Sequence, residues 1–74
     1  MAANLDTVKI WSDAVNEFNT YVLPQVKLDF EQDGVADWPA RREAWNNFTD
    51  FLCKNLEISD WQYENWSQPA SCGA

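Results

Sequence analysis

The sequence predicts an all-α protein built as an antiparallel helical hairpin with a short third helix. Two stretches carry apolar residues at steps of three and four, which is the spacing of one face of a helix. A third, shorter stretch begins with a capping box. Because 74 residues suffice for one domain at most, we expect a single helical domain over residues 1–66 and a flexible tail over residues 67–74.

The first apolar stripe predicts a helix over residues 8–22. Asn4 or Asp6 can cap its start, since either side chain can accept a hydrogen bond from a free N–H of the first turn. The stripe repeats over two heptads, as in helices that pack against a partner helix. Its residues are predicted to lie in the core: Val8, Trp11, Val15, Phe18 and Val22.

Pro24 interrupts this stripe, because proline lacks a backbone N–H and its ring disfavours a continuing helix. The helix either ends near Val22, or it kinks and continues from Pro24 to about residue 32. Apolar residues at positions 26 and 30 favour the kinked helix. The alternation of Val26, Leu28 and Phe30 also fits a short strand.

The second stripe predicts the central helix of the protein, over residues 37–55. Asp37 is a suitable N-cap, and Pro39 falls in the first turn, where its missing N–H is not needed. The large apolar residues of this helix are predicted to complete the core with those of the first: Trp45, Phe48 and Leu52.

A capping box formed by Ser59 and Gln62 predicts the third helix, over residues 60–66. Tyr63 is assigned to the core on the inner face of this helix. Trp61 points about 140° away from Trp66 at 100° per residue. We expect both tryptophans to anchor a protein partner, since tryptophan is enriched among the residues that dominate interface energetics.

Charge narrows the classes of partner. Twelve acidic and five basic residues give a net charge of −7, which opposes direct binding to nucleic acids and to anionic membranes. The same charge suits a partner protein with a basic surface. In the acidic linker of residues 29–37, the candidates for steering such a partner are Asp29, Glu31 and Asp33.

Arg41 and Arg42 form the only pair of adjacent basic residues. Two positive charges near a helix N-terminus oppose the helix dipole, so each needs a carboxylate nearby. Asp33 and Asp37 could supply it within the chain, or both arginines could bind acidic residues of a partner.

The sequence predicts no enzyme, cofactor or metal site. There is no histidine to serve as a general base, and Cys53 and Cys72 lack the spacing of a zinc site, so we expect free thiols. The acidic linker opens like a calcium-binding loop, but Ala40 stands where that loop needs a bidentate glutamate.

The segment DWPARREAWNNFTDFLCKNLEISDWQYENWSQP, residues 37–69, resembles short acidic proteins of tailed bacteriophages. The resemblance implies a bacterial cytoplasmic setting and an accessory role outside the virion. It also implies binding to a host protein, such as a restriction, CRISPR or transcription component, that is thereby disabled. A cytoplasmic location agrees with the N-terminal MAANLDTVK, which lacks the apolar run of a signal peptide.

The sequence therefore favours a small acidic protein-interaction module, an inhibitor of a host protein. One alternative is a self-assembling structural or scaffolding protein, whose exposed aromatic residues would bind copies of itself. Another is a nucleic-acid mimic, in which carboxylates replace phosphates. Because a two-helix core leaves apolar surface open, we also expect a homodimer.

Overall fold

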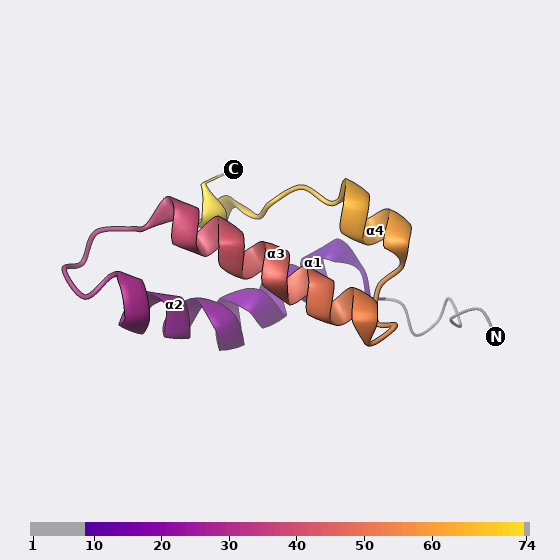
Figure 1. Ribbon diagram of the computed structural model, residues 1–74, viewed down its shortest axis with the longest axis horizontal. Helices are drawn as coiled ribbons and strands as arrows, with labels where there is room; N and C mark the ends of the chain where they lie inside the picture. The colour runs from indigo at the N-terminus through magenta and orange to yellow at the C-terminus, as the bar shows by residue number, and fades with distance from the viewer. Residues whose placement is uncertain (1–8, 74) are drawn as a thin grey trace.

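Three helices form the part of the chain that the computed structural model describes, residues 9–73 (Figure 1). The first helix has 20 residues in three continuous segments, and it runs antiparallel to α3, which has 17. These residues include no strand, so the all-α hairpin with a short third helix is confirmed. The elements are α1 (Trp11–Glu17), the π-helical segment η2 (Phe18–Val22), α2 (Leu23–Phe30), α3 (Trp38–Lys54), α4 (Asp60–Asn65) and the 3₁₀ turn η3 (Ala70–Cys72).

The first helix begins at Trp11, later than the sequence predicts. Lys9 and Ile10 precede the helix, and the Lys9 N–H donates to the Glu57 carbonyl at 2.9 Å. This bond ties the start of the helix to the connection between α3 and α4. The predicted caps Asn4 and Asp6, and the predicted core residue Val8, lie outside the described residues.

Pro24 widens the first helix without ending it. The Leu23 N–H donates to the carbonyl of Phe18, five residues earlier, which makes residues 18–22 a π-helical turn. Such a turn accommodates a proline, because the proline has no N–H and its ring would clash with the carbonyl four residues back. The helix then continues through α2 to Phe30, so the helical alternative for this segment is confirmed and the strand is wrong.

The π turn adds one residue to the helix and changes which side chains face the core. The buried residues of the first helix are Ala14, Phe18, Leu23 and Val26, and the step from Phe18 to Leu23 is five. Leu23 therefore occupies the position predicted for Val22, which is only half-buried.

The centre of the core is aromatic. The Phe18 and Trp45 rings meet edge to face with centroids 5.3 Å apart, and Phe48 lies 5.9 Å from Phe18 and 6.1 Å from Trp45. Leu52 is buried beside them, whereas Phe48 and Val15 are half-buried.

The ends of α3 and α4 follow from their caps. The Asp37 carboxylate accepts the Ala40 N–H at 3.0 Å, and Pro39 stands in the first turn as predicted. Ser59 and Gln62 form both hydrogen bonds of the capping box that starts α4. The third helix is six residues long and leads into a segment that returns along α3 (Figure 1).

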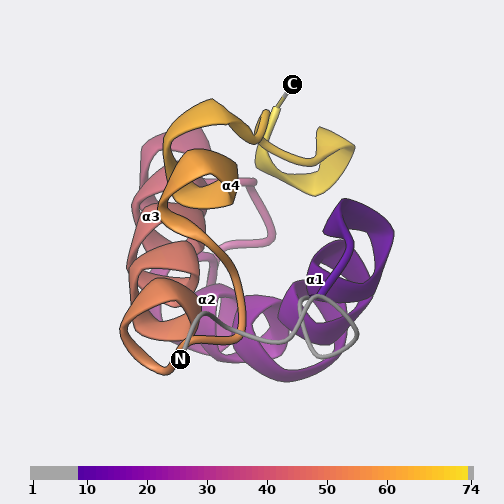
Figure 2. The same ribbon diagram turned by 90° about the vertical axis from the view of Figure 1, so that its right-hand side faces the viewer.

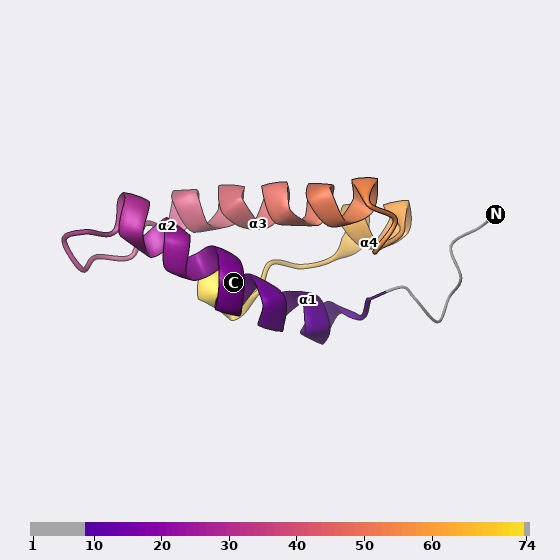
Figure 3. The same cartoon turned by 90° about the horizontal axis from the view of Figure 1, so that it is seen from below.

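The C-terminal segment is packed, contrary to the flexible tail predicted for residues 67–74. Viewed along the helices, residues 66–73 form a third side beside α3 and the first helix (Figure 2). Pro69 and Cys72 are fully buried, and the Trp11 indole N–H donates to the Ser67 carbonyl at 2.9 Å. The first helix crosses α3 at an angle (Figure 3), and this segment packs against both helices. The C-terminal segment contains few apolar residues. It packs nevertheless, because the two crossing helices leave apolar surface between them that the segment covers.

Candidate protein-binding groove

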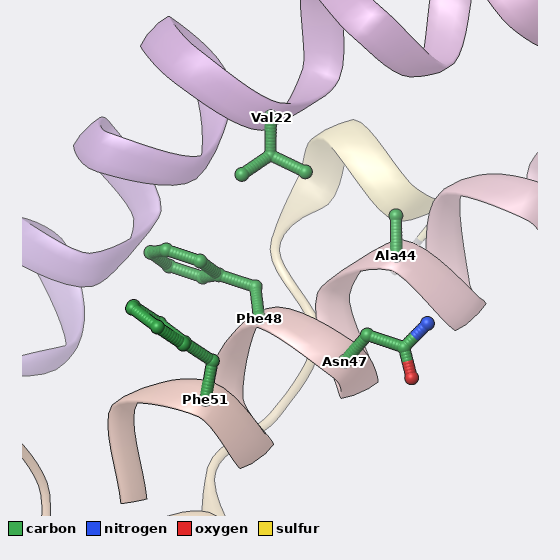
Figure 4. Close-up of a pocket in the computed structure, with 5 residues that line it drawn as sticks. All are labelled: Val22, Ala44, Asn47, Phe48 and Phe51. Carbon is green, nitrogen blue, oxygen red and sulfur yellow. The ribbon is translucent and has the colours of Figure 1, made fainter. Parts of the chain in front are cut away.

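An open groove of about 480 Å³ lies between the first helix and α3 (Figure 4). Its lining is apolar except for one amide side chain, and it consists of Val22, Ala44, Asn47, Phe48 and Phe51. The Phe48 and Phe51 rings lie side by side below Val22, and the amide of Asn47 points away from them. The C-terminal segment is visible behind the groove, so it covers the opposite face of the hairpin.

Two local features of the sequence create this groove. On α3 the lining residues occupy one flank of the helix, because 44, 47, 48 and 51 are separated by steps of three, one and three. On the first helix the π turn leaves Val22 half-buried, packed against the core and lining one wall of the groove. Pro24 is therefore the indirect cause of the groove.

Phe51 is the most exposed aromatic residue of the groove, with 55% of its surface accessible. The sequence places it at the flank of the apolar stripe, which does not reveal whether it is covered. The signal that could have identified it is the seven-residue step from Ala44, which marks a second apolar row beside the core row.

Acidic residues occur near the lining residues in both helices, although none of them lines the groove. On α3, Glu43 and Asp50 lie four residues before and three after Asn47, and so on its outer side. On the first helix, Asp29 lies two turns beyond Val22 and accepts a hydrogen bond from Gln25 at 3.0 Å. Asp50 pairs with Lys54 at 2.9 Å, whereas neither Asp29 nor Glu43 has an ion-pair partner among residues 9–73.

Two of the predicted partner-binding residues are instead bound to each other. The Arg41 Nε and Nη2 atoms donate to the two Glu31 carboxylate oxygens at 2.6 and 2.7 Å, and both side chains are largely buried. Arg41 also donates to the Ser71 carbonyl at 3.0 Å and stacks over the Trp38 ring at 5.0 Å. This ion pair joins the loop after α2 to α3, and Arg41 extends the link to the C-terminal segment. Arg41 and Glu31 are therefore not available to a partner.

The Glu31 carboxylate is strongly stabilised in its charged form. The side-chain hydrogen bonds from Arg41, followed by the backbone N–H of Asp37, lower the pKa of Glu31 from 4.5 to about 2. Sequence reasoning paired Arg41 with Asp33 or Asp37. Instead, the turn at Gly34, with φ +80°, folds the linker back so that Glu31 lies beside Arg41.

The remaining predicted linker residues stay at the surface. Asp29 and Asp33 are exposed, and Asp33 accepts the N–H of Val35 at 3.0 Å within the turn. Arg42 is half-buried, and its Nη1 atom lies near Gly73 of the C-terminal segment. Arg42 is thus on the side of α3 that faces away from the groove.

The aromatic residues around α4 differ in burial from the prediction. Trp61 is 67% exposed, whereas Trp66, its predicted companion on a partner surface, packs against the core. Tyr63 was assigned to the core but is 41% exposed, because the buried anchor before α4 is Ile58. Trp11 was also assigned to the core but is 39% exposed, and its indole N–H donates to the Ser67 carbonyl.

Both thiols have pKa values raised above the ordinary value of a cysteine. A hydrogen bond to Asp60 at 3.1 Å raises the pKa of Cys53, which is half-buried, and burial raises the pKa of Cys72. Neither cysteine forms a disulfide. Over residues 9–73, no cluster of three or more acidic, cysteine or histidine side chains is placed to hold a metal ion.

None of the helices in the described part of the chain has the length and apolar character needed to cross a bilayer. Comparison of the sequence and structure with protein-family models, curated proteins and solved structures yields no match.

Proposed function

We propose that the protein is a small acidic interaction module that binds another protein through the groove between the first helix and α3. The observation that carries this proposal is Phe51, a large aromatic side chain left 55% exposed beside a nearly apolar hollow. Covering such a side chain removes apolar surface from water, and aromatic residues in pockets are typical anchors of protein interfaces.

The partner is, in this proposal, a bacterial host protein that is inhibited by the binding. The resemblance of residues 37–69 to accessory proteins of tailed phages supports this setting, with restriction, CRISPR and transcription components as target classes. Trp61, also exposed, is a candidate second contact. The net charge of −7 supports a partner with a basic surface.

A pull-down from bacterial lysate, read by mass spectrometry with and without nuclease, tests this function. The bait is the full chain, compared with a Phe51→Ser variant and a matched control, Leu28→Ser. Leu28 is an exposed apolar residue of α2 that does not line the groove. Circular dichroism establishes that all three proteins are equally helical.

We expect the native chain and Leu28→Ser to capture the same stoichiometric protein, and Phe51→Ser to lose it. Recovery of the bait alone would contradict the proposal and favour self-assembly. Capture that Phe51→Ser leaves unchanged would exclude the groove. A partner that DNA displaces, and that high salt releases, would favour nucleic-acid mimicry.

A further inference from the structure

We infer that the groove binds a single amphipathic helix of the partner, with lysine or arginine residues beside its apolar face. This inference rests on the proposed function, because it names the part of the partner that the groove contacts. It is carried by the shape of the groove and by the distribution of charge around it.

The shape of the groove fits one helix. Its walls are two antiparallel helices, and the lining on α3 extends from Ala44 to Phe51, about 10 Å at 1.5 Å per residue. An incoming helix would place apolar residues at positions i, i+3 or i+4 and i+7 over that length. The C-terminal segment covers the opposite face of the hairpin, so the groove is where a further helix would complete a bundle (Figures 2 and 4).

The charges around the groove favour basic residues on that helix. Glu43 lies one turn before Asn47 on the outer row of α3, and Asp29 lies two turns along the first helix from Val22; neither makes an ion pair within residues 9–73. The basic residues of α3 are engaged elsewhere, since Arg41 binds Glu31, Lys54 binds Asp50 and Arg42 lies near Gly73. A helix with basic residues beside its apolar face would therefore meet carboxylates that have no partner among the described residues.

The same features disfavour a second copy of the chain as the occupant. A two-fold interface brings the same patch of each copy together, so acidic surface would meet acidic surface. Each copy also carries a net charge of −7, which opposes their association.

Fluorescence anisotropy with three labelled helical peptides of about 16 residues tests the inference on the full chain. The first peptide has an apolar stripe flanked by lysine and arginine. The second has the same stripe flanked by glutamate, and the third keeps the basic residues but replaces the stripe with serine and glutamine. Each is titrated with the native chain, Phe51→Ser and Leu28→Ser, at about 50 and about 500 mM salt.

We expect the first peptide to bind at least about tenfold more tightly than either of the others, since apolar and charged contacts both contribute. Phe51→Ser should weaken its binding about tenfold or more, Leu28→Ser should not, and high salt should weaken it. If the glutamate-flanked peptide binds as tightly as the basic-flanked one, the inference that the partner helix carries lysine or arginine beside its apolar face is wrong. Equal binding of the stripe-free peptide, or no effect of Phe51→Ser, would overturn the helix-in-groove geometry.

Two further results separate this inference from the proposed function. If none of the peptides binds while capture from lysate still requires Phe51, the inferred helix is wrong and the protein-binding function stands. Sedimentation of the native chain as a dimer, with Phe51→Ser as a monomer, would assign the groove to a second copy and overturn the inference. If capture fails but the first peptide binds with the expected dependence on Phe51, the groove retains its specificity and the host-protein function is rejected.

Discussion

Leu56 has a backbone conformation that leucine rarely adopts. Its φ of +62° lies in the left-handed region, and it ends α3 in the position where glycine is usual. The Glu57 N–H donates to the Leu52 carbonyl and the Leu56 N–H to the Cys53 carbonyl, which is the hydrogen-bond pattern of a Schellman motif. Since the side chain is 70% exposed, burial does not offset the strain.

We predict that Leu56→Gly raises the free energy of unfolding by about 0.5–1 kcal/mol, because glycine adopts positive φ without a steric penalty. Leu56→Ala is the matched control, since alanine keeps the Cβ and with it the strain. Urea denaturation followed by circular dichroism measures both. An equal gain in the alanine variant would show that the exposed side chain, and not the backbone, is unfavourable.

Glu31 should make stability sensitive to acid. Its pKa in the folded protein is about 2, below the ordinary value of 4.5, so the unfolded chain binds a proton first as pH falls. The stabilisation is therefore complete above about pH 4.5 and is lost progressively as pH falls towards 2.

Glu31→Gln should remove this part of the acid dependence and lower stability at neutral pH, because Arg41 then loses its carboxylate partner. Glu64→Gln is the matched control, since it removes one carboxylate from an exposed position that makes no ion pair within residues 9–73. Thermal melts between about pH 2 and 7 compare the variants. If the melting temperatures of the native chain and Glu31→Gln fall in parallel as pH is lowered, another group is responsible for the acid dependence of stability.

Among the elements, the helices are where sequence reasoning succeeds. Local signals determine their ends: Asp37 caps α3, and Ser59 with Gln62 caps α4. The π turn could not be located from the sequence, because a proline inside a helix permits a break, a kink or a widened turn. Its consequence, the exchange of Val22 for Leu23 in the core, was missed for the same reason.

The C-terminal segment is the element that sequence reasoning misjudged most. Residues such as serine and glycine predict a loose tail, but Pro69 and Cys72 are buried through contacts with residues distant in the chain. The Ser71 hydroxyl also donates to the Asn19 amide oxygen at 2.7 Å. Such long-range packing leaves no periodic signal in eight residues.

We predict that a chain ending at Trp66 loses about 3 kcal/mol or more of stability, because burial of two side chains is lost together with several hydrogen bonds. Removing Ala74 alone is the control and should have little effect. Chemical denaturation, with tryptophan fluorescence as the probe, measures the difference. A truncated chain as stable as the native one would mean that the segment packs without stabilising the fold.

For the molecule as a whole, the sequence predicted an acidic helical hairpin with exposed aromatic residues, but it did not predict where the proposed binding surface lies. Net charge and aromatic content are sums, which say little about where side chains lie. Of the predicted anchors, Trp61 is exposed, whereas Trp66 and Arg41 are engaged within the chain. The groove depends on Phe51 and on a displaced Val22, and only the relative placement of the two helices reveals it.

The sequence predicts a homodimer because a thin two-helix core leaves apolar surface open. The C-terminal segment now covers one of the two faces that a second copy could have used. The chain carries a net charge of −7, which favours a basic partner over another acidic chain. The homodimer stays a prediction, and sedimentation of the native chain tests it.

We propose that the groove is the principal binding face and that Trp61 of α4 is a second contact outside it. Chemical-shift mapping of the isotope-labelled full chain with the basic-flanked peptide tests it most directly. We predict the largest amide shifts in residues 18–26 and 44–51, with small shifts in residues 60–66. Shifts centred on Trp61 and its neighbours, with residues 44–51 unmoved, would contradict it.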